Sequence, residues 1–226
     1  QFTNQGARQF SLDAKPENIE ELAALTAIYR PGPLKANVHR KYVKAKKNAD
    51  SIHYDHPIIK EILGPTFGFV TFQEQFMLLA QKLAGFDPGE SDKLRKTLVK
   101  KSLDTLASKG SEKAIAREKF IKGAKELNDI PESVSSKLWA DIEFFSVYGF
   151  NKSHAVAYAI DSYYAAWLHT HYETEWLATI LQSENGNPKG MSKAISEIKS
   201  FGYEIAAIDI NHSGTEWEYS QTLQAF

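Results

Sequence analysis

Helix-spaced apolar residues, interrupted repeatedly by proline and glycine, are the feature that most constrains the fold. In residues 16–30, apolar side chains recur at helical spacing until the sequence "RPGP" ends the pattern at residues 30–33. Proline disfavours helical dihedrals in the residue before it, and glycine permits unusual ones. Further helical segments are expected at residues 34–47, 73–86, 87–101, 111–127, 129–145, 152–182 and 191–202. The chain is therefore predicted to be mainly α-helical.

The C-terminal end carries a different pattern. "YEIAAIDI" (residues 203–210) and "TEWEYS" (215–220) look like short strands, so two strands are predicted there. "TFGFVTF" (66–72) suits either a strand or a buried extended segment. We therefore expect a multi-helix core over residues 1–185 and a small α/β segment over 186–226, which holds the small β element.

Composition excludes several classes of protein. The chain has no cysteine, which excludes a disulfide framework and a thiolate metal site. It has no apolar run of about 18 residues and its first residues do not resemble a signal peptide. These features predict a cytoplasmic protein without a membrane partner. The chain begins with Gln rather than Met, so we expect it to be a piece of a longer protein.

The charge of the chain is unevenly distributed, although the net charge is −1. Residues 93–126 hold eleven Lys and Arg against four acids, and residues 35–47 hold six Lys and Arg and no acid. Two such basic stretches indicate a surface that faces a polyanion. The alternative is that both are solvated helix faces.

The stretch "YGFNKSHAVAYA" (148–159) gathers polar side chains where a helix is expected to begin. Asn151, Lys152, Ser153 and His154 lie at this start, and Tyr158 lies one helical turn beyond His154. The first N–H groups of a helix lack partners and carry partial positive charge, so they favour anions. The stretch is predicted to bind phosphate. In the alternative interpretation Ser153 is simply a helix cap and His154 a core residue.

A second basic group follows residue 92. Lys93, Lys96 and Lys100 are spaced so that they form one helical stripe, and Arg95 and Lys101 lie beside it. Contacts from such a stripe to phosphates would make binding depend strongly on salt. The alternative is that these cations are solvated.

Two further residues suggest specific contacts. The guanidinium of Arg30 can grip a phosphate with two hydrogen bonds, or it can cap the carbonyls of the helix that it follows. Glu74 can orient a cation such as Arg95, or it can be a local salt-bridge partner.

Several signatures of catalysis are missing. The sequence has no P-loop, no His-Glu-x-x-His pair and no strand with paired aspartates for two-metal phosphoryl transfer. We therefore predict no catalytic residue and no metal site within this chain.

Four motifs, taken in order, resemble those of a known family. They are "ELAALTAIYRPGPL", "GFVTFQEQFMLLAQKLAGFDPGESDKLRKTLVKK", "FSVYGFNKSHAVAYAIDSYYAAWLHTHY" and "AAIDINHS". Together they resemble the fingers region of the family C bacterial replicative DNA polymerases, the family of the DNA polymerase III alpha subunit. The resemblance runs from residue 2 to residue 211, nearly the whole chain.

The resemblance implies a DNA-directed DNA polymerase, a nucleotidyltransferase of DNA replication. Its catalytic aspartates and Mg²⁺ would belong to a palm domain outside this chain, so this piece alone would be inactive. The implied partners are incoming dNTP, primer–template DNA, the other polymerase domains and, through regions outside this chain, a sliding clamp. The sequence departs from the family at Lys96, where an Arg is usual, and at Val99, where a Gly is usual.

The resemblance also assigns roles to residues. The candidates for contact with the triphosphate or with DNA phosphates are Arg30, Arg95, Lys100, Lys101, Asn151, Lys152, Ser153 and His154, and Tyr158 is placed near the nascent base pair. Lys93 and Lys96 are candidates for the DNA backbone.

Two other functions fit the same residues. The chain could be a stand-alone helical DNA-binding module that uses the basic stripe, or a helical scaffold whose basic face contacts an acidic protein.

Overall fold

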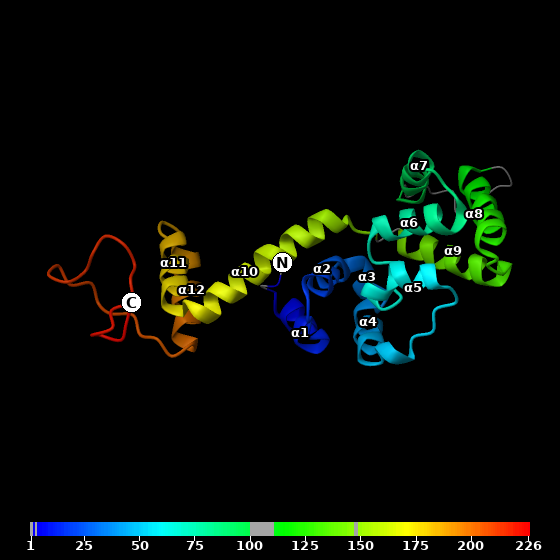
Figure 1. Ribbon diagram of the computed structural model, residues 1–226. Helices are drawn as coiled ribbons and strands as arrows, with labels where there is room; N and C mark the ends of the chain where they lie inside the picture. Colours follow the sequence, from blue (N-terminus) through cyan, green and yellow to red (C-terminus); the bar gives the residue numbers. More distant parts are fainter. Residues whose placement is uncertain (1, 3, 100–110, 147–148) are drawn as a thin grey trace. The chain divides into compact units, whose positions relative to one another are not determined.

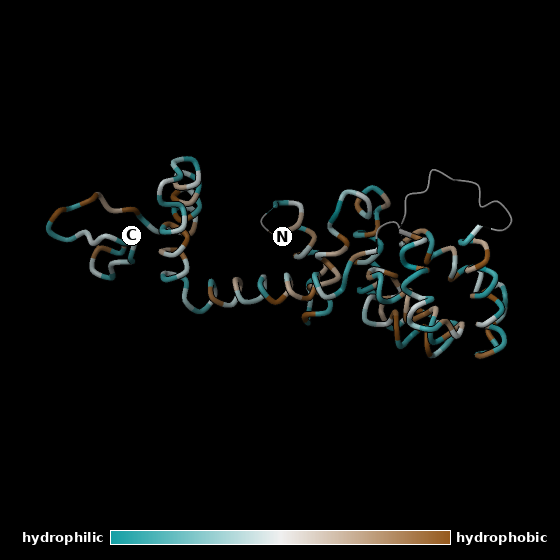
Figure 2. Tube along the Cα trace, turned by 90° about the horizontal axis from the view of Figure 1, so that it is seen from above, coloured by the Kyte–Doolittle hydropathy of each residue, from teal (hydrophilic) through white to brown (hydrophobic). Residues whose placement is uncertain are grey.

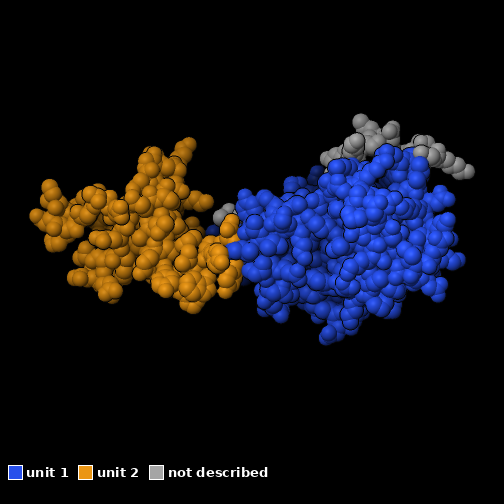
Figure 3. Space-filling model, turned by 45° about the horizontal axis from the view of Figure 1, so that its top comes forward, with its two compact units in different colours: residues 1–160 blue, residues 161–226 orange. Residues whose placement is uncertain are grey.

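The computed structural model of the protein describes residues 2, 4–99, 111–146 and 149–226. These residues are mainly helical, as the sequence predicts, and the chain divides into two compact units, residues 1–160 and 161–226 (Figures 1 and 3). The helices up to the boundary are α1 (Gln5–Ala14), α2 (Ile19–Ile28), α3 (Pro31–Lys35), α4 (Val38–Lys47), α5 (Pro57–Leu63), α6 (Gln73–Ala84), α7 (Pro88–Val99), α8 (Glu112–Asn128) and α9 (Glu132–Ser146). Helix α10 (Lys152–His171) begins in the first unit and continues into the second.

The larger core of the first unit is built around α6. Helices α5, α7, α8 and α9 pack their apolar residues against it, and Phe76, Phe120 and Trp139 are almost completely buried. Gly123 allows α8 to lie close to the end of α6, because a Cβ at this position would be 2.2 Å from the carbonyl oxygen of Ala84. The sequence pattern of α6, apolar over most of its surface, fits this central place.

A second core in the same unit holds α10 in place. Helices α1, α2 and α4 bury Phe10, Leu25 and Tyr42 there. Ala155 and Ala159 of α10 are fully buried in this cluster. Two alanines one turn apart give α10 a narrow face that can approach its neighbours closely. The start of α10, where the polar stretch lies, is thereby fixed to the first unit.

Two predicted helices are each divided in the structure. In the predicted helix 34–47, the first two residues are the end of α3, which begins at Pro31, and α4 begins after Asn37, whose φ of 55° is left-handed. The predicted helix 152–182 ends at His171, and α11 (Glu173–Ser183) begins after Tyr172, which has non-helical dihedrals. The helices α1 and α5 were not predicted. Their starts are capped by the side chains of Asn4 and His56.

The second unit is organised around α11 and α12 (Pro188–Ser200), and its core includes Leu177, Leu181 and Ile198. The boundary predicted after residue 185 lies between these two helices and stays a prediction. The predicted C-terminal β element is not confirmed, since the described residues of this segment form isolated bridges, such as Glu204 with Ala225, and no strand.

The physical reason is a missing partner. A strand needs a neighbour of several residues to be stable, and in the described structure the pairing extends little beyond residues 204–206 with 225–226. Ile208 and Ile210 are consequently 92% and 96% exposed. Figure 2 shows hydrophobic stretches in the C-terminal segment that follows α12.

Candidate functional site

The start of α10 is capped by Asn151. The Asn151 Oδ1 atom accepts a hydrogen bond from the backbone N–H of His154 at 2.9 Å, and the hydroxyl of Ser153 donates to the same oxygen. A side-chain oxygen that binds the third amide of a helix is typical of an N-cap residue. Asn151 is therefore the N-cap residue in place of Ser153, and the Ser153 hydroxyl supports the cap through its own hydrogen bond.

A carboxylate of the protein already occupies this helix start. Glu74, in the first turn of α6, accepts a hydrogen bond from the backbone N–H of Lys152 and another from the side-chain amide of Asn151, both at 3.0 Å. A negative charge beside the first turn of a helix is stabilising. The helix start therefore binds a carboxylate of the chain itself, and the binding of phosphate there stays a prediction.

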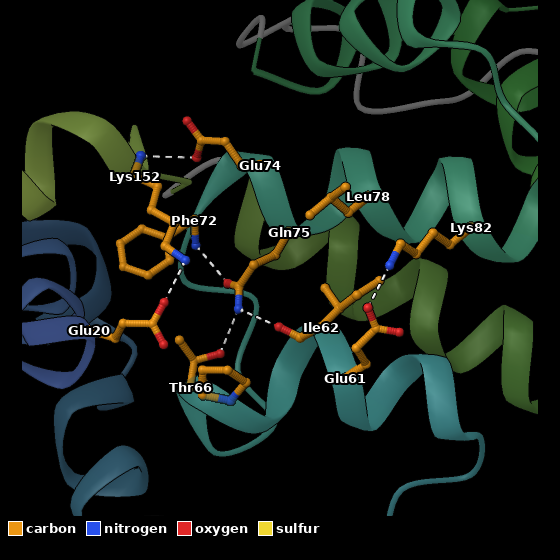
Figure 4. Close-up of a pocket in the computed structure, with 11 residues that line it drawn as sticks. Glu20, Glu61, Ile62, Thr66, Phe72, Glu74, Gln75, Leu78, Lys82 and Lys152 are labelled. Carbon is orange, nitrogen blue, oxygen red and sulfur yellow. Dashed lines mark hydrogen bonds and ion pairs between the residues drawn. The ribbon is translucent and has the colours of Figure 1, made fainter. Parts of the chain in front are cut away.

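The ammonium group of Lys152 has its own partner. It lies 2.9 Å from a carboxylate oxygen of Glu20 in the first turn of α2 and 5.9 Å from the centroid of the buried Phe72 ring. Figure 4 shows Lys152, Glu20 and Glu74 lining one pocket of about 240 Å³. A second ion pair, between Lys82 and Glu61 at 2.5 Å, lines the same pocket.

Arg30 lies at one end of a row of rings. Its guanidinium carbon lies 4.4 Å from the centroid of Phe150. Phe150 lies 5.3 Å from the ring of His154, which lies 4.5 Å from that of Tyr158. His154 and Tyr158 are exposed. The row therefore combines a permanent cation with flat aromatic surfaces that solvent can reach.

Two features of its surroundings affect how Arg30 can bind a phosphate: a hydrogen bond to its own helix and the burial of its guanidinium. Its Nε atom donates a hydrogen bond to the carbonyl of Ala27 at 2.9 Å, so the alternative in which Arg30 caps its own helix is realised in part. Burial lowers the pKa of the Arg30 guanidinium. An arginine remains protonated in proteins in spite of such a shift.

Phe150 is a site residue that the sequence analysis missed. Its backbone N–H donates to Thr71 at 3.3 Å, and its carbonyl accepts from Gln73 at 3.0 Å, which forms a bridge with Phe72. Its position beside Arg30 depends on a contact between residues far apart in the sequence. Only its location inside the stretch 148–159 was available as a signal.

The segment 66–72 carries this bridge and is a loop, neither strand nor helix after Thr66, in which residues 70–72 are buried. Gln75 holds the loop. Its Oε1 atom accepts from the N–H groups of Thr71 and Phe72 at 2.8 and 3.0 Å, and its Nε2 atom donates to the carbonyl of Ile62 at 3.1 Å and the hydroxyl of Thr66 at 2.7 Å. A buried amide satisfied in this way fixes the backbone around it.

The basic group of α7 is partly neutralised by acids. Arg95 and Lys96 both pair with Asp92, at 2.8 and 2.7 Å, and Lys93 pairs with Glu112 of α8 at 3.3 Å. The hydrogen bonds from Lys96 and Arg95 lower the pKa of Asp92. Arg95 is therefore oriented by Asp92, not by Glu74.

The structure brings some of the predicted residues together and not others. Arg30, Asn151, Lys152, Ser153, His154 and Tyr158 meet around Phe150 and Glu74. Lys93, Arg95 and Lys96 form a separate group on α7. Lys100 and Lys101 lie outside the described residues.

The described part of the chain lacks both a cluster of metal ligands and a helix that could span a membrane. It contains no group of three or more His, Cys, Asp or Glu side chains able to hold a metal ion. Within the same residues, no helix combines the length and the apolar character that crossing a membrane requires.

Comparisons with known proteins agree with the resemblance seen in the motifs. Residues 1–128 match the family model of the bacterial DNA polymerase III alpha subunit finger domain. This match includes Arg30 and Arg95 and ends before the start of α10.

Individual relatives extend the similarity over nearly the whole chain. The DNA polymerase III subunit alpha of Aquifex aeolicus is 39% identical over 213 residues, which is 94% of this chain and 18% of the relative. That of Borreliella burgdorferi is 36% identical over 222 residues, 98% of this chain and 18% of the relative. That of Vibrio cholerae is 35% identical over 216 residues, 93% of this chain and 18% of the relative.

The chain thus spans about a fifth of the length of these relatives. More than half of its residues match one family model, and the four motifs that suggested the family lie within the similar region. The chain therefore belongs to the family of the bacterial DNA polymerase III alpha subunit finger domain.

Proposed function

We propose that this chain is the part of a replicative DNA polymerase that holds the incoming dNTP and the primer–template during DNA synthesis. Two kinds of support meet in this proposal. The family membership indicates a polymerase, and the chain carries cations and exposed rings at one helix start. The nucleotidyl transfer itself would be completed by palm residues outside this chain.

The observation that carries the proposal is the row of Arg30, Phe150, His154 and Tyr158 beside Lys152. A nucleoside triphosphate offers phosphates for the cations and a flat base for the rings. Arginine can bind phosphate oxygens with two hydrogen bonds, and exposed aromatic rings can stack on bases. Tyr158 is 40% exposed, which is compatible with a place near the nascent base pair.

The geometry favours side chains over backbone amides as the phosphate ligands. Because Glu74 accepts from the backbone N–H of Lys152, contact with the triphosphate would come from Lys152, Arg30 and His154. Asn151 and Ser153 would hold the helix start in shape.

The α7 group would contact phosphates separately. Arg95 is assigned to phosphate contact, and Lys93 and Lys96 to the DNA backbone. The assignments of Lys100 and Lys101 to phosphate contact remain predictions.

Mg²⁺ would be held outside this chain. The described residues do not offer a set of ligands that fits it, so no step of the proposal passes through a metal bound here. What these residues would supply is position and charge, and preorganised charge is a large component of phosphoryl-transfer catalysis. A sliding clamp would bind through other regions of the polymerase.

The proposal is tested by changing Lys152→Ala in the full polymerase and measuring single-nucleotide primer extension. A charged contact to the triphosphate is worth roughly 1.5–3 kcal/mol, so kcat/KM for dNTP is expected to fall about tenfold or more. The matched control is Lys82→Ala, which removes the other ammonium of the pocket. Equal kinetics for the two variants would contradict the proposal.

A further inference from the structure

Lys152 meets two carboxylates in different ways. Glu74 binds its backbone N–H, which belongs to the first turn of α10, and also binds Asn151. Glu20 binds only the ammonium group at the end of the side chain, at 2.9 Å. The backbone contact is fixed with the helix, whereas the ammonium contact can open by rotation of the flexible lysine stem.

We propose that Glu20 is a displaceable partner of Lys152. Its carboxylate holds the ammonium group while no nucleotide is bound, and yields it to the triphosphate when the nucleotide arrives. This inference rests on the proposed function of Lys152 as a triphosphate contact. It adds Glu20 as a residue that sets nucleotide affinity through Lys152 and does not itself touch the nucleotide.

The exposure of the pair supports exchange. The side chains of Lys152 and Glu20 are 40% and 54% exposed. Water and salt reach such a pair, so it contributes little stability and opens readily. A triphosphate carries several negative charges and attracts an ammonium more strongly than one carboxylate does.

The charge of the pocket indicates the direction of the exchange. The pocket is lined by Glu20, Glu61 and Glu74 against Lys82 and Lys152 (Figure 4). Three carboxylates against two ammonium groups leave an excess of negative charge, which repels a polyphosphate. The ammonium group of Lys152 therefore turns out of the pocket to meet the nucleotide, and the carboxylate of Glu20 stays behind.

The alternative is that the ion pair between Lys152 and Glu20 is only a structural contact, and this alternative predicts the opposite effect on nucleotide binding. If the ion pair served only to hold α2 against α10, its loss would loosen the site and weaken nucleotide binding. If Glu20 competes with the triphosphate, its neutralisation would strengthen binding. The sign of the effect therefore separates the two interpretations.

The test is Glu20→Gln in the full polymerase, with dNTP KM and kcat measured by single-nucleotide primer extension. The amide keeps the size of the side chain and removes its charge. We expect KM to fall about two- to fivefold, the range of an exposed ion pair, with kcat unchanged. A KM that is unchanged or higher overturns the proposal.

The matched control is Glu61→Gln. Glu61 lines the same pocket and pairs with Lys82, which has no assigned contact to the nucleotide. The control removes the same charge from the same pocket, so KM is expected to stay at the unmodified value. An equal fall in KM would mean that any lost negative charge suffices, and would overturn the specific role of Glu20.

A double variant separates this inference from the function on which it rests. In a Lys152→Gln background, Glu20→Gln is expected to have no further effect, because its partner is gone. If Lys152→Gln alone leaves KM unchanged, the proposed contact and this inference both fail. If Lys152→Gln raises KM while Glu20→Gln does not lower it, the contact stands and only the displacement fails.

Discussion

Gln75 shows how one residue can support a site that it does not touch. Its side-chain amide forms hydrogen bonds with two backbone N–H groups, one carbonyl and one hydroxyl, and the residue is 6% exposed. These bonds fix the loop that ends at Phe72, and Phe72 forms a bridge with Phe150. The ring against which Arg30 lies is therefore positioned through a chain of contacts that begins at Gln75.

Replacing this amide is predicted to destabilise the fold. Gln75→Leu leaves buried N–H groups and a buried carbonyl without partners, at about 1–3 kcal/mol for each group that water does not reach. The expected loss of unfolding free energy is about 2–4 kcal/mol, measured by chemical denaturation of the chain. An unchanged midpoint would contradict the role assigned to the amide.

A second variant at this position gives a pH-dependent control. Gln75→Glu keeps an oxygen for Thr71 and Phe72, and only the protonated carboxyl can donate to Ile62. Burial raises the pKa of such a carboxyl in the folded state. The free energy of unfolding of this variant is therefore expected to be highest below about pH 4, where the carboxyl is protonated in both the folded and the unfolded chain. It falls as the pH rises, because the unfolded chain loses the proton first. The leucine variant is expected to lack this dependence.

The sequence predicted residues of the site that share one local segment. Asn151, Lys152, Ser153, His154 and Tyr158 were found because helix-start chemistry and helical spacing are local signals. Glu74 and Glu20 were not identified as their partners, because these contacts join residues 77 and 132 positions apart. A sequence pattern carries no information about which distant carboxylate completes a helix start.

At the scale of elements, helical periodicity located most helices but not their interruptions. Apolar residues continue on both sides of Asn37 and Tyr172, so periodicity marks neither break. Asn37 does carry a weak local signal, because asparagine tolerates the left-handed conformation that it adopts. Residues 203–210 have the short apolar composition of a strand, yet in the described structure this segment lacks a partner strand to stabilise it. Periodicity reports which face would be buried, and tertiary packing decides whether it is.

The contact between α6 and α8 yields a prediction at this scale. Gly123→Ala places a Cβ against the backbone of Ala84, which cannot move without shifting the end of α6. We expect a loss of about 1–3 kcal/mol in the free energy of unfolding, typical of overpacking. Thermal and chemical denaturation of the chain measure it.

Gly64→Ala is the matched control for this change. Gly64 has right-handed helical dihedrals (φ −53°), and an added Cβ would meet no atom within 4 Å. Its expected effect is neutral or stabilising by up to about 1 kcal/mol, because alanine restricts the unfolded chain. If both variants lost the same stability, the close approach of α8 to α6 would not be the cause.

At the scale of the whole molecule, the two units carry opposite charge. Residues 161–226 hold nine acids and three lysines, so the first unit holds the remaining 24 basic and 19 acidic residues. A polyanion is attracted by the first unit and repelled by the second. The proposed DNA contact therefore belongs to the first unit, which also contains the basic group of α7.

Charge reversal tests this division. The double variant Lys93→Glu with Lys96→Glu is expected to bind a primer–template duplex more weakly. The slope of the logarithm of the binding constant against the logarithm of the salt concentration is expected to become less steep by about two. Fluorescence anisotropy at several salt concentrations measures both quantities. The matched control, Lys189→Glu with Lys193→Glu on the exposed surface of α12, is expected to leave the slope unchanged. Equal losses from both pairs would place the DNA contact on both units.

The carboxylate at the start of α10 has a consequence for the design of small molecules that bind there. An anionic compound aimed at this helix terminus would have to expel Glu74 from two hydrogen bonds, one of them to the backbone. The neighbouring pocket, with its excess of carboxylates and its apolar Ile62, Phe72 and Leu78, instead suits a compact hydrophobic compound that bears an amine. Such a compound would compete with Lys152 for Glu20, so by the proposed exchange it would free the ammonium group for the triphosphate and raise nucleotide affinity.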